Sequence, residues 1–279
     1  MSAAGPSPAA EFVYTAPVSP VFWVTLVLYG VAGVFYYVGF FTKSPAWVTR
    51  AARWVLFLAF LSHTVEISLR GVDHVHPGTS IREATGFLSW LVVGGFLWSS
   101  VRQRVAVLGV FVAPIAAALL AVARLSPSGR ATEGLNLLGR IHISLAMLGV
   151  AAFAIAGGLS MVYLVQERIL KGKKFEGILY RRAVALETLD KMAHRLVLVG
   201  FPLFTIGLLL GAIWGSQRSA SFARPEYPIA MLAWAAFGSL IVARSVLGWR
   251  GRKAALLTVV GFTAAAVVVV IYFVRRAMG

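Results

Sequence analysis

The chain of 279 residues contains no cysteine. It therefore has no disulfide, no zinc–thiolate site and no C-x-x-C redox pair. The C-x-x-C-H signature for covalent haem attachment is excluded on the same ground, so the protein is not itself a c-type cytochrome. Any cofactor chemistry must depend on other side chains.

Charged residues are also scarce. They make up 13% of the chain, whereas apolar residues make up 59% and the mean hydropathy is +0.83. An average soluble domain is about 25% charged and 45–50% apolar. Apolar runs cover nearly the whole chain, which excludes a soluble enzyme with a membrane tail and also the short alternating strands of a membrane β-barrel. Lipid is the expected solvent.

A transmembrane helix needs about 20 mostly apolar residues. Eight runs approach this length. Their sequences show no convincing internal repeat. They cover roughly residues 21–41, 54–69, 84–101, 105–123, 141–165, 196–215, 227–247 and 254–274. The sequence therefore predicts an all-α polytopic membrane protein with about eight transmembrane helices.

Residues 1–19 contain three prolines and neither lysine nor arginine, and they predict an unstructured extracytoplasmic tail ahead of a membrane domain over 20–279. With the N-terminus outside, 17 of the 26 lysines and arginines lie in the inner connections, eight of them in 166–195. Basic residues favour the cytoplasmic side, so we expect both termini outside. This bias also accounts for the net charge of +16 without a nucleic-acid partner.

Five histidines are the obvious candidate ligands. His63 lies in the second span, and Glu66 and Arg70 follow on the same helical face. This spacing fits a metal-ligating histidine whose second nitrogen is held by a carboxylate, and it fits equally a hydrogen bond that only packs helices. His142 begins the fifth span beside Arg140. It is a second candidate ligand, and the alternative is a histidine that simply lies at the membrane interface.

The remaining histidines carry weaker signals. His74 and His76 form an H-x-H pair without a nearby third ligand, and His194 reads as a basic residue at the cytoplasmic boundary. Buried acids are too few for a proton-coupled transporter, which keeps small-solute transport a less favoured function. No catalytic triad, phosphate-binding loop or pair of carboxylates indicates an enzyme.

Five segments in order resemble the cytochrome c assembly family of CcsA- and HemX-like membrane proteins, relatives of the haem-handling CcmC group. The segments are SHTVEISLRG, HPGTSIREATGFLSW, RIHISLAMLGVAAFAIAGGLSMVYL, LVGFPLFTIGLLLGAIWG and GWRGRKAALLTVVGF. The resemblance is strongest over 56–276. It implies a multi-pass protein of the bacterial cytoplasmic membrane that handles haem at its outer face, with cytochrome c assembly components as partners.

The resemblance also implies particular site residues. His63 and His142 match positions at which family members ligate haem iron, which suggests non-covalent haem b as the cofactor. Propionates need cationic partners near the surface, and Arg140, Arg218 and Arg224 lie on the predicted outer side. A solvated loop charge is the alternative for each arginine.

One departure from the family bears on function. Members that attach haem carry a W-G-x-x-W-x-W-D loop, of which only Trp214 and Gly215 are present here. Histidines expected in the last two spans are absent. The chain therefore resembles the branch without the haem-presenting loop, and we expect a non-catalytic haem-handling or accessory role. The alternative is a HemX-like regulator that acts on a haem-synthesis enzyme through 166–195.

Overall fold

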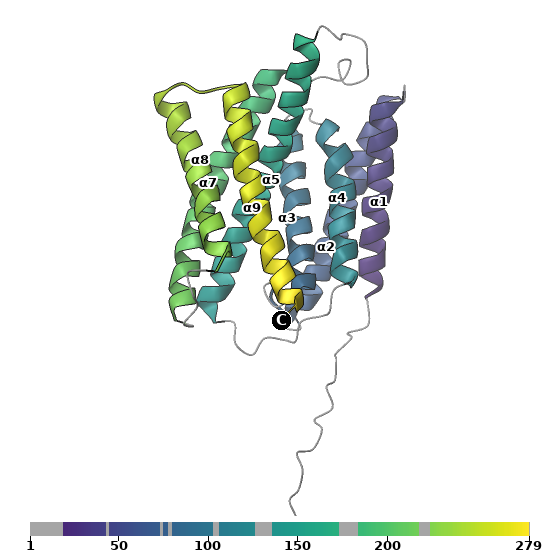
Figure 1. Ribbon diagram of the computed structural model, residues 1–279. Coiled ribbons are helices and arrows are strands. Elements are labelled where there is room, and N and C mark those ends of the chain that lie inside the picture. Colours follow the sequence, from purple (N-terminus) through teal and green to yellow (C-terminus); the bar gives the residue numbers. More distant parts are fainter. Residues whose placement is uncertain are drawn as a thin grey trace, which may run out of the picture.

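The computed structural model describes residues 19–42, 45–72, 75–77, 80–102, 106–125, 136–172, 184–217 and 224–278. Eight helices in these residues are long and apolar enough to cross a membrane, which confirms the all-α prediction (Figure 1). They are α1 (Pro20–Phe41), α2 (Ala46–Val72), α3 (Ile81–Arg102), α4 (Ala106–Leu125), α5 (Leu137–Lys171), α7 (Leu186–Ser216), α8 (Glu226–Val246) and α9 (Arg252–Met278).

The connection between α5 and α7 is shorter than predicted. The sequence suggests a loop over 166–195, but α5 continues to Lys171 and α7 already begins at Leu186. Charged residues at these ends form i,i+4 pairs, Glu167 with Lys171 and Glu187 with Lys191, and such pairs support a helix beyond the apolar run. Residues 173–183 lie outside the described part of the chain.

Local capping explains where two of the helices begin. The Ser19 hydroxyl accepts a hydrogen bond from the Phe22 amide at 3.3 Å, and a proline follows at the first helical position. The Asn136 side chain likewise accepts from the Gly139 amide at 3.0 Å. Both caps satisfy amides that a helix start leaves without partners. The second cap fixes the start of α5 close to His142.

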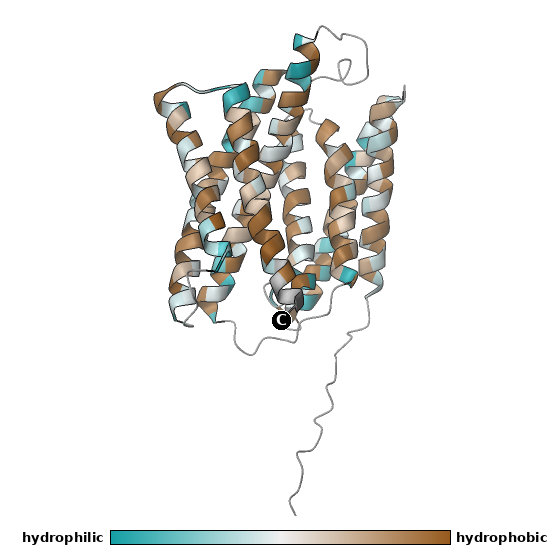
Figure 2. Ribbon diagram, viewed as in Figure 1, coloured by the Kyte–Doolittle hydropathy of each residue, from teal (hydrophilic) through white to brown (hydrophobic). Residues whose placement is uncertain are grey.

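Apolar side chains cover the outsides of the helices as well as the interior (Figure 2). Many large ones on the outside are at least 40% exposed, for example Trp54, Val34 and Leu232. In water such a surface would be unstable, whereas lipid solvates it. The exposed faces therefore agree with a membrane location for all eight helices.

The helices form two rings of four. In the first ring α1 packs on α2 and α4, while α3 packs on α4 and more sparsely on α2. In the second ring α5 packs on α7 and α9, while α8 packs on α9 and more sparsely on α7. The main bridge between the rings is the contact of α3 with α5. The two units thus have the same helix order and run in the same direction, because each contains an even number of helices.

The buried faces of α2 and α7 show that this likeness extends to single residues. Six buried positions of α2 correspond, at a constant separation along the chain, to six buried positions of α7. The pairs are Val48 with Leu189, Ala52 with Ala193, Leu56 with Val197, Ala59 with Gly200, His63 with Phe204, and Glu66 with Gly207. The sequence shows no convincing internal repeat because this likeness is carried by buried positions and not by residue identity.

A shared aromatic clamp confirms this register. Trp90 of α3 donates its indole N–H to Thr64 of α2 at 2.8 Å and stacks on Phe60. In the second unit, Trp234 of α8 donates to Thr205 of α7 at 3.0 Å and stacks on Phe201. Each clamp ties the second helix of a unit to the third, which is the edge with the fewest backbone contacts.

Candidate functional site

His63 lies inside the first unit with only 1% of its surface exposed. Its Nδ1 is 3.0 Å from the hydroxyl of Tyr29 on α1, and the two rings meet edge to face. On the other side its Nε2 faces Gly86 of α3, where a Cβ atom would come within 3.8 Å. The partner of His63 is therefore Tyr29. Within the described residues Glu66 makes no direct hydrogen bond to the imidazole, and Tyr29 lies at Nδ1 instead, as in the alternative of a hydrogen bond that packs helices.

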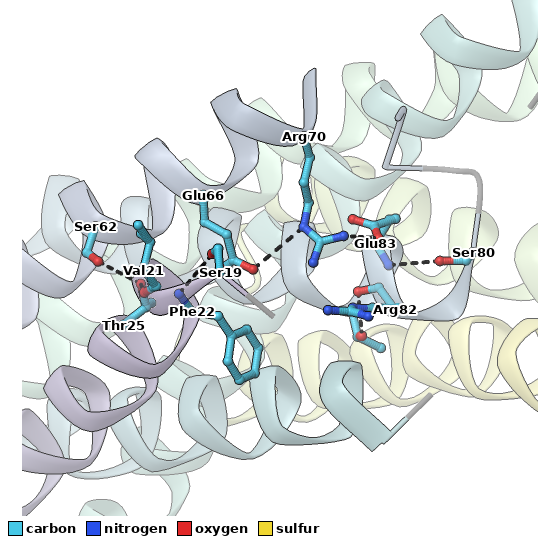
Figure 3. Close-up of polar contacts among 11 residues, drawn as sticks. Ser19, Val21, Phe22, Thr25, Ser62, Glu66, Arg70, Ser80, Arg82 and Glu83 are labelled. Carbon is cyan, nitrogen blue, oxygen red and sulfur yellow. Dashed lines mark hydrogen bonds and ion pairs between the residues drawn. The ribbon is translucent and has the colours of Figure 1, made fainter. Parts of the chain in front are cut away.

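Glu66 belongs instead to a network of charges at the ends of α2 and α3 (Figure 3). Arg70 lies 3.6 Å from Glu66, one turn back on α2, and donates a hydrogen bond to Glu83 on α3. Ser80 accepts a hydrogen bond from the Glu83 amide and caps α3. Arg82 is 6% exposed beside them. Two acids and two bases balance in charge, which is how ionisable groups are tolerated at membrane depth.

His63 and this network line one cavity of about 20 Å³ between α1, α2, α3 and α4. A pocket that encloses an organic ligand measures about 300–1,000 Å³. The imidazole and the arginines have the right chemistry for haem iron and propionates, but the enclosed space does not hold a macrocycle. Occupation of His63 by haem would require the ends of α2 and α3 to separate.

His142 lies in the second unit, half-buried on the α5–α7 interface. Its Nδ1 is 2.6 Å from the main-chain carbonyl of Gly207. A carbonyl only accepts, so Nδ1 carries the proton and Nε2 keeps its lone pair. This arrangement is typical of histidines that ligate metals. The chemistry and the partly open setting of His142 therefore fit a haem ligand.

The glycines of α7 make room for this imidazole. A Cβ atom at Gly211 would lie 2.5 Å from the ring, and one at Gly207 would lie 2.9 Å from the backbone of Ala146. Trp214 follows one turn later, with its ring centroid 6.0 Å from that of His142. Gly207 thus allows α5 and α7 to pack closely, and Gly211 leaves the space that the His142 ring occupies.

The start of α5 adds a cationic group to this site. Arg140 is exposed two residues before His142. Burial chiefly, and then the charge of Arg140, lower the pKa of His76 in the α2–α3 connection. Arg224 is exposed at the start of α8, whereas His74 and Arg218 lie outside the described residues.

The two candidate ligands lie in different units and at different depths. His142 contacts Gly207 and Gly211, which correspond to Glu66 and Arg70 of the first unit. His63 corresponds to Phe204, one to two turns further from the predicted outer face, a difference of roughly 5–10 Å along the helix. The structure thus places the two histidines in different units and at different depths.

Comparison of the two units draws attention to Tyr29, a neighbour of His63 that the sequence did not reveal. The ring pair of Tyr29 and His63 corresponds to Phe153 and Phe204, which also pack edge to face, at 5.5 Å. One unit is thus polar where the other is purely aromatic. Tyr29 is absent from the sequence-based candidates because a lone tyrosine in an apolar span resembles any core aromatic residue.

Known proteins match most of the chain. Residues 80–279 match the family model described as Cytochrome C assembly protein. The cytochrome c biogenesis protein CcsA of Microcystis aeruginosa is 27% identical over 238 residues, which is 67% of this chain and 73% of the relative. CcsA of Thermosynechococcus vestitus is 27% identical over 289 residues, with 87% and 88% covered. CcsA of Gloeobacter violaceus is 25% identical over 263 residues, with 74% and 78% covered.

The matched region contains Arg140, His142 and Trp214, whereas His63 lies before it. The CcsA relatives are named for cytochrome c biogenesis, and their alignments cover two thirds or more of both chains. Because the family model covers well over half of the sequence, the protein belongs to the cytochrome c assembly protein family.

Proposed function

We propose that the protein is a haem-handling integral membrane component of cytochrome c biogenesis that binds haem b without a covalent bond. The observation that carries this proposal is the hydrogen bond from His142 Nδ1 to the Gly207 carbonyl, which leaves Nε2 free to ligate iron. Membership of the cytochrome c assembly family supports the same role.

Each neighbour of His142 has a task under this proposal. Arg140 supplies a planar cation for a propionate carboxylate at the membrane surface. Trp214 supplies an aromatic wall beside the imidazole. Gly211 leaves space for the ring and thereby fixes its orientation. Haem supplies the iron that accepts the imidazole lone pair, while the protein supplies the binding and the orientation.

His63 is proposed as the second ligand, in the site within the first unit. The Tyr29 hydroxyl orients its ring, and Arg70 and Arg82 lie on the same cavity. Access to this site depends on movement of α2 against α3, whose direct backbone contacts are few. Two sites at two depths favour two binding events over one haem held by both histidines.

The proposed role is non-catalytic, because the chain lacks most of the tryptophan-rich loop beyond Trp214. Its proposed setting is the bacterial cytoplasmic membrane, with both termini outside and with other cytochrome c assembly components as partners. A HemX-like regulatory role in haem synthesis is the alternative if haem does not bind.

Haem titration of the detergent-purified protein tests the proposal. We expect a Soret band in the wild type that is strongly reduced in His142→Ala and reduced in His63→Ala. His194→Ala is the matched control, because His194 lies near the opposite ends of the helices. In His142→Gly, added imidazole is expected to restore the band by occupying the vacated space.

Two results would contradict the assignment. A wild type that takes up no haem would favour the regulatory alternative. A His142→Gly protein that binds haem as tightly as the wild type, with or without imidazole, would remove His142 from the site. Gel filtration of every variant separates loss of binding from loss of folding.

A further inference from the structure

Two buried charged side chains in the first unit each have an atom without a partner. Glu66 is 5% exposed and Arg82 is 6% exposed. Glu66 Oε2 and Arg82 Nη2 have no hydrogen-bond partner within the part of the chain that the structure describes. An unpaired buried donor or acceptor costs about 1–3 kcal/mol, and more for a charged group. These two atoms therefore need a partner that the described residues do not provide.

Both side chains line the same cavity, together with His63 (Figure 3 shows the two charged residues). Its volume of about 20 Å³ exceeds the roughly 10–15 Å³ that one water needs and is far below that of an organic ligand. The occupant must accept a hydrogen bond from a guanidinium and donate one to a carboxylate. Water does both.

We propose that this cavity binds one ordered water molecule, which accepts a hydrogen bond from Arg82 Nη2 and donates one to Glu66 Oε2. Its second hydrogen faces the third polar group of the cavity, His63 Nε2, when His63 Nδ1 donates to Tyr29. A buried water typically makes about three such bonds. Among the described residues no group of three metal-binding side chains exists, so a metal ion is not the occupant.

The water links α2 to α3. Glu66 lies on α2 and Arg82 on α3, and the direct ion pair of Arg70 with Glu83 is the neighbouring tie between the same helices. In the second unit Gly207 occupies the position of Glu66, and it packs directly on α5. The water is thus a polar link between α2 and α3 in the unit that contains His63. The water belongs to the haem-free protein, because haem at His63 would take the same Nε2.

X-ray footprinting in detergent tests the proposal, because radicals formed from a bound water modify the side chains beside it. Phe22 lines the cavity and is 1% exposed, so its modification reports internal water and not bulk solvent. Phe153 is the matched control, since it is fully buried between Phe204 and Phe237. We expect modification of Phe22 and none of Phe153.

The variant Glu66→Leu/Arg82→Leu removes two of the three partners of the water and leaves only His63, which is fewer than the roughly 2–4 polar partners that a buried water needs. We expect Phe22 modification to fall by roughly an order of magnitude, with Phe153 still protected. Modification of Phe153 would reveal unfolding, and a high-resolution density map of the wild type then decides. A peak within hydrogen-bonding distance of Glu66 Oε2 and Arg82 Nη2 supports the water. An unmodified Phe22, an empty map, or an anomalous peak after bromide exchange, which would indicate an anion, overturns it.

Discussion

At the residue scale, His63 and Phe204 occupy corresponding positions of the two units but differ in chemistry. Both project from the second helix of their unit against an aromatic ring of the first, Tyr29 in one case and Phe153 in the other. The aromatic pair needs only packing, whereas the polar pair needs a hydrogen bond because lipid offers none. The polar pair is therefore a feature that stability alone does not demand.

This comparison predicts the result of converting one unit into the other. The double variant Tyr29→Phe/His63→Phe replaces both partners with apolar rings, so we expect stability within about 1 kcal/mol of the wild type. Tyr29→Phe alone leaves His63 without a partner, and we expect a loss of about 1–3 kcal/mol. Thermal unfolding in detergent measures both. A double variant less stable than Tyr29→Phe would contradict the equivalence of the units.

His76 provides a prediction about pH. Burial, and secondarily the Arg140 charge, lower its pKa below the ordinary value of 6.5, so the unfolded chain binds the proton more readily than the folded one. We expect the unfolding temperature to fall as the pH drops through about 6.5, and His76→Asn to flatten this dependence. An unfolding temperature with equal pH dependence in wild type and variant would exclude a contribution from His76.

At the element scale, the clamp of threonine, tryptophan and phenylalanine holds the sparse edge of each unit. Thr64→Val and Thr205→Val keep the side-chain shape but remove the acceptor of the tryptophan N–H. We expect each to cost about 0.5–2 kcal/mol, the range measured for hydrogen bonds between membrane helices. Thr263→Val, on an exposed face of α9, is the matched control and should have little effect. Equal stability of all three variants would show that the clamps do not hold the units.

Much of this element structure follows from the sequence, and the reasons for the rest are physical. Apolar length predicts all eight helices, because a span must satisfy its own backbone. It misses the extensions of α5 and α7, which are charged and helical beyond the apolar run. The close contact of the His142 ring with Gly211 depends on which helices are neighbours, and hydropathy contains no such information. The repeat escapes detection because glycine stands opposite glutamate.

At the scale of the whole molecule, the charge bias predicts one orientation. This cysteine-free chain allows a direct test with Leu137→Cys, at the predicted outer end of α5, and Lys191→Cys, near the inner end of α7; both side chains are more than half exposed. We expect an impermeant thiol reagent to label position 137 in intact cells, and position 191 only after lysis. Labelling of 191 alone in intact cells would reverse the orientation and move His142 to the cytoplasmic side.

The length of α5 has a consequence for the position of its charged end. Its 35 residues extend about 52 Å, against a hydrocarbon core of about 30 Å. In Figure 1 it stands above its neighbours at the end opposite the start of α1 and the end of α9. His142 lies near one end of this rod, and the Glu167–Lys171 pair lies at the other. α5 therefore extends beyond the hydrocarbon core, and the extra length places the Glu167–Lys171 turn among headgroups and water, where neither charge has to enter hydrocarbon.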